Sequence, residues 1–216
     1  MVIACEVLRA QIESLGSTPF SYIYLEQGLH RTPDKLRKQL QDTINGCRDY
    51  TILLLGYGLC SRAVIGLKVA PYQRMIIPKI DDCIGISLGS RAKYYSEFEQ
   101  NPGTYYFTRG WIETATDPLT EYYETIPKFG EELARWAALE TLKNYKRTLF
   151  IKTDGCNLEF SRKYVKKFAK FFELKYEEIE GSLGYVNKLL FGPWDNDFVI
   201  TNGVEISDEM FASVIT

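Results

Sequence analysis

The fold predicted for this chain follows from the stretch TILLLGYGLCS, residues 51–61. The apolar run at residues 52–55 has the length and composition of a short buried β-strand, and Gly56 and Gly58 end it in a turn. Cys60 then lies where we expect the chain to enter a helix. The stretch therefore predicts a strand followed by a helix, which is the repeating unit of an α/β sheet.

The same alternation of strand and helix continues on both sides of this stretch. Apolar runs predict further strands or extended segments at residues 1–5, 20–25, 75–77, 104–107, 148–152, 175–179 and 198–201. Helical spacing and capping signals predict helices at residues 6–15, 33–45, 130–145, 161–172 and 183–190. The pattern predicts a three-layer α/β fold with a mostly parallel sheet, Rossmann-like and doubly wound. We expect residues 1–216 to form one α/β domain, or two small lobes that join near residues 110–145.

Four of the five cysteines follow predicted strands: Cys5, Cys60, Cys83 and Cys156. If these strands belong to one parallel sheet, their carboxyl ends place all four thiols along one edge, where open α/β sheets bind their ligands. Zinc and iron–sulfur clusters both take thiolate ligands, so we predict a metal centre at this edge. The chain lacks the local C-x2-C spacing of common metal sites. The competing interpretation is that each cysteine is a small buried hydrophobic residue, and we assign Cys47 to that class.

The glycine loop after residue 55 resembles a dinucleotide-binding fingerprint only in part. Its third glycine is missing, and no acidic residue follows at the ribose-binding spacing, so a classical NAD or FAD site is not predicted. Gly56 and Gly58 would still let the backbone approach a bound cofactor, with Ser61 beside it. We also expect a helix starting near Cys60 to lower the pKa of its thiol.

Two polar side chains are candidates for general acid–base catalysis. His30, the chain's single histidine, lies between a predicted strand and a predicted helix. Its alternatives are a proton or substrate contact, which we prefer, a metal ligand, and a residue that orders the turn. Asp82 directly precedes Cys83 and is either a general acid or base or an ordinary helix N-cap.

Aromatic residues are concentrated in the middle of the chain, from residue 94 to residue 128. Tyr105 and Trp111 are predicted to form a wall for a flat, partly apolar ligand. The alternative is that they pack in the core.

Composition limits the classes of partner. The net charge is −2, and lysine and arginine are spread along the chain, so neither nucleic acid nor an anionic membrane is expected as a partner. The first residues lack the pattern of a secretory signal, and no apolar run has the roughly 20 residues that span a bilayer. We therefore predict a cytoplasmic protein whose thiols stay reduced.

Several short motifs together carry a family resemblance. They lie at residues 4–9, 28–33, 55–60, 78–84, 88–90, 103–106 and 110–111. The combination resembles the domain of unknown function 1638 family, DUF1638, over residues 3 to about 200. That family occurs largely in anaerobic microbes, beside genes of corrinoid-dependent methyl transfer. The resemblance implies a role in anaerobic one-carbon or methyl metabolism, with Cys5, His30, Cys60 and Cys83 as site residues; Cys156 lies outside the motifs.

Two functions follow as expectations. The first is a cysteine-ligated zinc or iron–sulfur protein that acts in methyl transfer on a small-molecule substrate. The second is a non-catalytic accessory protein that holds a cofactor, contacts a corrinoid, or docks on a corrinoid protein or methyltransferase. A large aromatic-lined cleft without a tightly bound metal would favour the second.

Overall fold

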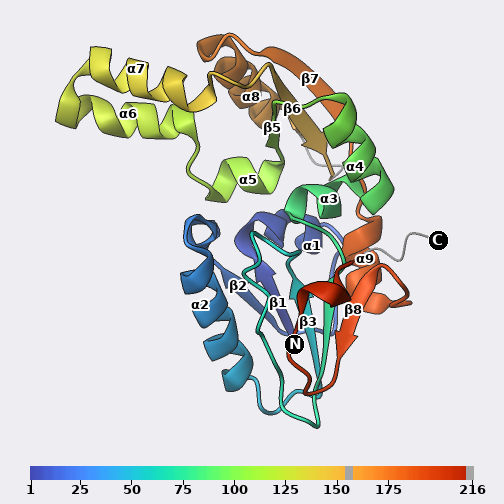
Figure 1. Cartoon of the computed structure of the whole chain (residues 1–216). Coiled ribbons are helices and arrows are strands. Elements are labelled where there is room, and N and C mark those ends of the chain that lie inside the picture. Colours follow the sequence, from blue (N-terminus) through green and yellow to red (C-terminus); the bar gives the residue numbers. More distant parts are fainter. Residues whose placement is uncertain (154–157, 213–216) are drawn as a thin grey trace.

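The computed structural model describes residues 1–153 and 158–212, and within them the strands form two separate sheets (Figure 1). The larger sheet has the strand order β2-β1-β3-β4-β8. Its strands are β1 (Val2–Cys5), β2 (Tyr22–Leu25), β3 (Ile52–Gly56), β4 (Arg74–Pro78) and β8 (Phe198–Thr201). All pairs are parallel except β4 with β8, which is antiparallel. The predicted mixed α/β fold with a mostly parallel sheet is confirmed.

The larger sheet is the middle layer of three. Successive residues of a strand point to opposite faces, so Leu53 and Leu55 pack on one side and Leu54 on the other. The first face is covered by α2 (Pro33–Gly46), which begins and ends within one residue of its prediction. The other face is covered by α1 (Arg9–Glu13) and α9 (Gly184–Phe191). Burial on both faces explains why these strands read as continuous apolar runs.

The smaller sheet is parallel throughout and has the order β5-β6-β7. Its strands are β5 (Thr104–Phe107), β6 (Arg147–Lys152) and β7 (Lys175–Glu180). Helix α8 (Glu159–Phe171) packs on it through a cluster of aromatic rings. A helical hairpin, α6 (Pro118–Phe129) and α7 (Glu131–Leu142), extends from this half of the molecule (Figure 1).

Helices α3 (Cys83–Leu88) and α4 (Arg91–Gln100) connect β4 of the larger sheet to β5 of the smaller sheet. The other short helices are α5 (Arg109–Thr114) after β5, and the 3-10 helices η1 (Glu6–Leu8), η2 (Gln27–Arg31) and η3 (Asp208–Met210). The chain leaves the larger sheet after α3 and returns to it after β7. Residues 110–145, where a join between lobes is predicted, include α6 and α7. Whether the chain folds as one domain or two stays a prediction.

Two expectations from the sequence are corrected by the topology. The runs that precede the four cysteines do not belong to one sheet, because β6 lies in the smaller sheet. No helix follows β3 directly, because residues 60–66 form turns. The described residues contain eight strands, one at each place where the sequence predicts a strand or an extended segment. Within residues 1–153 and 158–212, no helix has the length and apolar character needed to cross a membrane.

Candidate functional site

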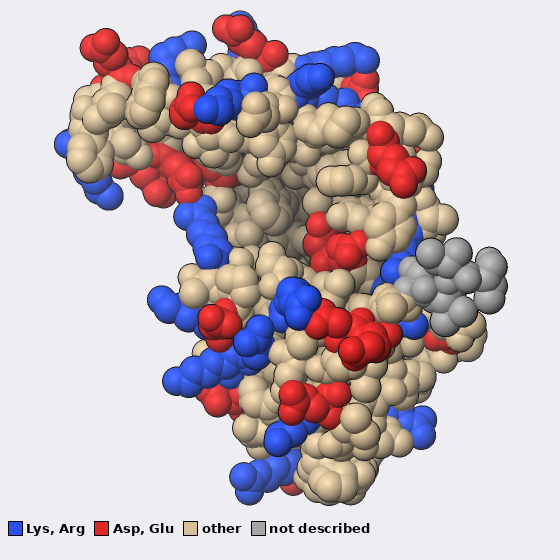
Figure 2. Space-filling view, viewed as in Figure 1, with Lys and Arg blue, Asp and Glu red and all other residues tan. Residues whose placement is uncertain are grey.

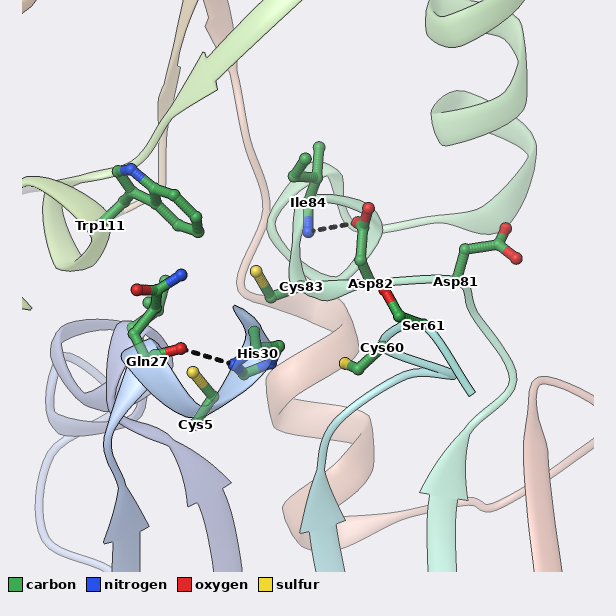
Figure 3. A pocket seen from close by; sticks show the side chains of 11 residues that line it. Cys5, Gln27, His30, Cys60, Ser61, Asp81, Asp82, Cys83, Ile84 and Trp111 are labelled. Atoms are coloured by element: carbon green, nitrogen blue, oxygen red, sulfur yellow. Dashed lines mark hydrogen bonds between the residues drawn. The ribbon is translucent and has the colours of Figure 1, made fainter. Parts of the chain in front are cut away.

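A cavity of about 370 Å³ lies at the carboxyl ends of β1, β3 and β4. Figure 2 shows a hollow at this level of the molecule, between the two sheets. The lining side chains, drawn in Figure 3, are Cys5, Val7, Gln27, His30, Cys60, Ser61, Asp81, Asp82, Cys83, Ile84 and Trp111. The cavity is therefore at the sheet edge where α/β folds bind ligands, as the sequence predicts.

Three of the four predicted thiols meet in this cavity. Cys5 is the last residue of β1, Cys60 lies in the turn after β3, and Cys83 is the first residue of α3 after β4. The order β1-β3-β4 makes these strands neighbours, and that is why residues far apart in sequence converge. Cys156 lies outside the described residues. Cys47 lies at the opposite end of the sheet, where its carbonyl accepts a 2.8 Å hydrogen bond from Gln73, just before β4 begins.

The turn that carries Cys60 has a left-handed backbone. Cys60, Ser61 and Arg62 have φ angles of 46°, 57° and 68°, a conformation that non-glycine residues seldom adopt in succession. Backbone pairing holds the turn: Leu59 N–H donates to the carbonyl of Ile80 and Cys60 N–H to that of Asp81, both at 2.8 Å. The turn after β3 is thereby fixed to the turn after β4, which places Cys60 beside Cys83. Strain of this kind, enforced by surrounding structure, is concentrated at functional sites.

The two loop glycines serve this packing. A Cβ on Gly56 would lie 2.6 Å from the Cβ of Ala4, and one on Gly58 would lie 2.4 Å from the carbonyl oxygen of Ile80. The close approach that the glycines permit is therefore to neighbouring protein atoms rather than to an open ligand space. Ser61 does line the cavity, as predicted.

Burial keeps the thiols protonated. It raises the pKa of Cys5 to about 11 and raises those of Cys60 and Cys83 further. The low pKa expected for Cys60 from a following helix is therefore corrected, because that helix is absent and the thiol is buried. Neutral thiols in such a place ionise only when a positive charge arrives beside them.

The imidazole of His30 has a defined tautomer. Its Nδ1 lies 3.0 Å from the carbonyl oxygen of Gln27, which can only accept, so Nδ1 carries the proton and Nε2 has a free lone pair. Burial lowers the pKa of His30, which favours the neutral ring. The ring stacks on Tyr57 with 5.8 Å between centroids. His30 is thus equipped to bind a metal or to accept a proton.

Asp82 caps a helix and also lines the cavity. One carboxylate oxygen accepts from the N–H of Ile84 at 2.9 Å and caps α3, and the other accepts from the hydroxyl of Tyr94 at 3.2 Å. Burial raises the pKa of this carboxyl. Both alternatives offered by the sequence therefore persist, since Asp82 is an N-cap that also faces the cavity.

Helix α5 supplies the wall of the cavity opposite the larger sheet. Trp111 lines it (Figure 3). Val7 of η1 also lines the cavity. A Cβ on Gly110 would lie 1.9 Å from the carbonyl oxygen of Val7, so the helix and η1 are in direct backbone contact. Tyr105 packs instead against Phe107 and Phe168 in the core of the smaller half. Trp111 lines the cavity, and its contact with a ligand stays a prediction, whereas Tyr105 packs in the core.

The described residues do not form a finished metal site. Among residues 1–153 and 158–212, no three His, Cys, Asp or Glu side chains are arranged to hold a metal ion. Figure 3 shows the thiols of Cys5, Cys60 and Cys83 around the imidazole of His30 rather than gathered on one point. The donors share a cavity, but they do not coordinate a common centre in this arrangement.

Five residues at the site were not among the predicted site residues: Val7, Gln27, Asp81 and Ile84, which line the cavity, and Tyr57, which stacks on His30. Gln27 lines the cavity from η2, three residues before His30, and this spacing places side chains on the same face of a 3-10 helix. The spacing of three residues between Gln27 and His30 was therefore a signal in the sequence that Gln27 lies at the site. Tyr57 is fully buried beside the site, and nothing in the sequence distinguishes it from an ordinary core tyrosine.

Comparison with known proteins gives one match. A family model described as a protein of unknown function (DUF1638) matches residues 24–190. The matched range runs from β2 to α9 and begins after Cys5, so it is shorter than the predicted resemblance. No curated protein and no solved structure matches the chain. Because the family model covers most of its 216 residues, the chain belongs to the DUF1638 family.

Proposed function

We propose that the cavity binds a zinc ion through Cys5, Cys60 and Cys83, with His30 as the fourth donor or as a base beside it. The observation that carries this proposal is the convergence of three thiols from three neighbouring parallel strands on one cavity. Three cysteines and one histidine are an established donor set for zinc. Core packing accounts for the burial of each thiol by itself, whereas a metal would also account for their convergence from three strands.

The donors fit zinc in chemistry, and zinc binding would require them to move together from the arrangement in the structure. A cysteine side chain has a single torsion, so a change of rotamer moves its sulfur while the backbone stays fixed. The three thiols are protonated by burial, and zinc would displace their protons and supply the compensating charge. His30 already has Nδ1 bonded to Gln27, an arrangement that orients metal-binding imidazoles in other proteins.

The space beside the thiols suits a small substrate. When bound, zinc acts as a Lewis acid that lowers the pKa of a coordinated thiol or water. If His30 is not a ligand, its Nε2 is free to accept the proton that such a group releases. Trp111 would cover the substrate and limit the access of water. We propose a thiol substrate that accepts a methyl group, in the anaerobic one-carbon metabolism implied by the family resemblance.

The size of the cavity limits how a corrinoid could bind. About 370 Å³ is near the small end of the ~300–1,000 Å³ found for sites of drug-sized ligands. A small thiol fits such a volume, whereas a corrinoid is larger than a drug-sized molecule. A corrinoid, or the corrinoid protein that carries it, would therefore approach the mouth of the cavity from outside.

A second candidate is an accessory protein that binds a cofactor without catalysis. The lining of the cavity by Gln27 and Trp111 favours it, since an amide and an aromatic ring suit an organic ligand as well as a metal. This candidate predicts a protein whose thiols hold no metal.

Metal analysis separates the two candidates. The protein is purified without oxygen, and its zinc, iron and acid-labile sulfide are measured together with the visible spectrum. The Cys60→Ser variant is compared with Cys47→Ser, which removes a buried thiol far from the cavity. Near-stoichiometric zinc that is lost in Cys60→Ser and kept in Cys47→Ser supports the proposal. Iron with sulfide would replace zinc by a cluster, and protein that stays metal-free after reconstitution would leave the accessory function.

A further inference from the structure

The side-chain amide of Gln27 has no partner within the protein. The residue is only 8% exposed, yet no hydrogen bond joins its amide to any residue within 1–153 and 158–212. Two other glutamines in this part of the chain are buried, and both are paired. Gln11 donates to the hydroxyl of Ser87 at 2.8 Å, and Gln73 donates to two backbone carbonyls at 2.8 Å. A buried amide without a partner is costly, so Gln27 needs an explanation that the other two do not.

The amide of Gln27 faces the cavity. Gln27 lines the cavity from η2, and Figure 3 shows its side chain pointing away from η2 toward Trp111. Its backbone is anchored, because its carbonyl lies 3.0 Å from the Nδ1 of His30 and accepts a hydrogen bond from it. The amide is therefore held at the border of the cavity, where a bound molecule can supply the missing partner.

The charge of the lining limits the kind of molecule that fits. Among the lining residues that the structure describes, Asp81 and Asp82 are acidic and none is a lysine or an arginine. An anionic ligand would lie beside two carboxylates without a counter-ion, which is unfavourable. Both carboxylates already accept hydrogen bonds from the protein, Asp81 from the hydroxyl of Tyr95 at 2.8 Å and Asp82 from that of Tyr94 at 3.2 Å. The amide of Gln27 lacks any such partner.

We propose that Gln27 selects the ligand of the cavity, an uncharged small molecule that presents an N–H donor beside a carbonyl acceptor. The glutamine amide carries both a donor and an acceptor, so it can form two parallel hydrogen bonds with such an edge, as found in a carboxamide or a lactam. Trp111 would contact a flat face of the same molecule. The inference rests on the proposed function only in taking the cavity as a small-molecule site, and it does not require the zinc ion.

The test compares probes of one shape and different charge. Benzamide is uncharged and has the proposed edge, benzoate is its anionic counterpart, and benzamidinium is its cationic counterpart. Binding is followed by calorimetry and by the NMR signals of the glutamine side-chain amides. We expect the wild type to bind benzamide at millimolar concentration, more tightly than either charged probe, with a shift of the Gln27 signal. In Gln27→Met the affinity for benzamide should fall by about tenfold, because two neutral hydrogen bonds are lost.

A second variant, Gln27→Glu, gives a readout that a merely structural role would not change. Glutamate keeps the shape of glutamine, but it replaces the N–H donors with a charged acceptor. Benzamidinium offers N–H donors on both sides of its edge and pairs well with a carboxylate. The preference should therefore reverse in Gln27→Glu, with benzamidinium bound more tightly than benzamide.

The matched control is Gln73→Met, which removes a buried amide that does bond to the protein. This variant should lose stability and keep its affinity for benzamide, whereas Gln27→Met should keep its melting temperature. The inference is refuted if the wild type does not bind benzamide, if it prefers a charged probe, or if Gln27→Met binds benzamide as tightly as the wild type. Zinc is measured in the same preparations. Benzamide binding that depends on Gln27 in protein without zinc would sink the zinc site and keep this inference, and zinc without benzamide binding would do the reverse.

Discussion

The substitution Gly110→Ala tests how the cavity wall is attached. The added Cβ would lie 1.9 Å from the carbonyl oxygen of Val7 and 2.8 Å from its carbonyl carbon. These are backbone atoms, which cannot rotate away, so α5 and η1 must separate. Overpacking of a buried site typically costs about 1–3 kcal/mol, and contact with backbone places this case near the upper end. For a chain of this size, roughly 2–4 °C per kcal/mol predicts a fall of about 6–12 °C in melting temperature.

Thermal and urea unfolding, followed by circular dichroism, measure this effect. The control is Gly46→Ala at the end of α2, where a Cβ meets nothing within 4 Å and where stability should hold or rise slightly. Separation of α5 from η1 should also move Trp111 from the cavity and speed the reaction of the thiols with a disulfide reagent. A Gly110→Ala protein whose melting temperature falls by less than about 2 °C would refute the contact, since even the low end of the overpacking range, about 1 kcal/mol, lowers it by roughly 2–4 °C.

Two further predictions concern ionisation. Burial raises the pKa of Cys5 from an ordinary 9.0 to about 11. Near pH 8, Cys5 should therefore have about a hundredfold less thiolate in the metal-free folded protein than in the protein unfolded by urea. The thiolate fraction of Cys60 in the folded protein should be lower still. Fast labelling of both in the folded state would contradict this. Hydrogen bonds from Lys175 and Arg147 lower the pKa of Glu177 below its ordinary value of 4.5. The Glu177 carboxylate therefore stabilises the folded state fully above its ordinary pKa of 4.5. This stabilisation is lost as the pH falls through the lowered pKa. The free energy of unfolding should therefore decrease more steeply with acid in the wild type than in Glu177→Gln, and parallel curves in urea titrations would refute the role of the pair.

The sequence predicts local structure well where one signal dominates. Thr32, Pro33 and the apolar spacing after them locate α2 to within a residue. The apolar run before Gly56 predicts β3 because a strand buried on both faces has few polar residues. For the same reason Cys5, Cys60 and Cys83 could be assigned to one edge, since parallel strands end at the same side of a sheet.

Long-range pairing could not be read from the same signals. The run before Cys156 looks like the runs before the other cysteines, yet β6 pairs with β5 and β7 in a second sheet. The pairing of strands depends on contacts between segments that are distant in sequence, and the apolar composition of a strand does not predict these contacts. The prediction that all four runs belong to one sheet failed at this step, although each strand was predicted correctly, and Cys156 itself lies outside the described residues.

The turn after β3 shows how such pairing determines the chemistry of the site. Glycines followed by Cys60 and Ser61 are compatible with a helix start, which would expose the thiol and lower its pKa. In the folded chain, the bonds from Leu59 and Cys60 to the turn after β4 select a left-handed turn instead. Burial thereby raises the pKa of the Cys60 thiol and keeps it protonated, whereas a free nucleophile needs a lowered pKa. The reactivity of Cys60 is therefore set by the partner of its loop, because the backbone bonds to the turn after β4 hold its thiol in the interior.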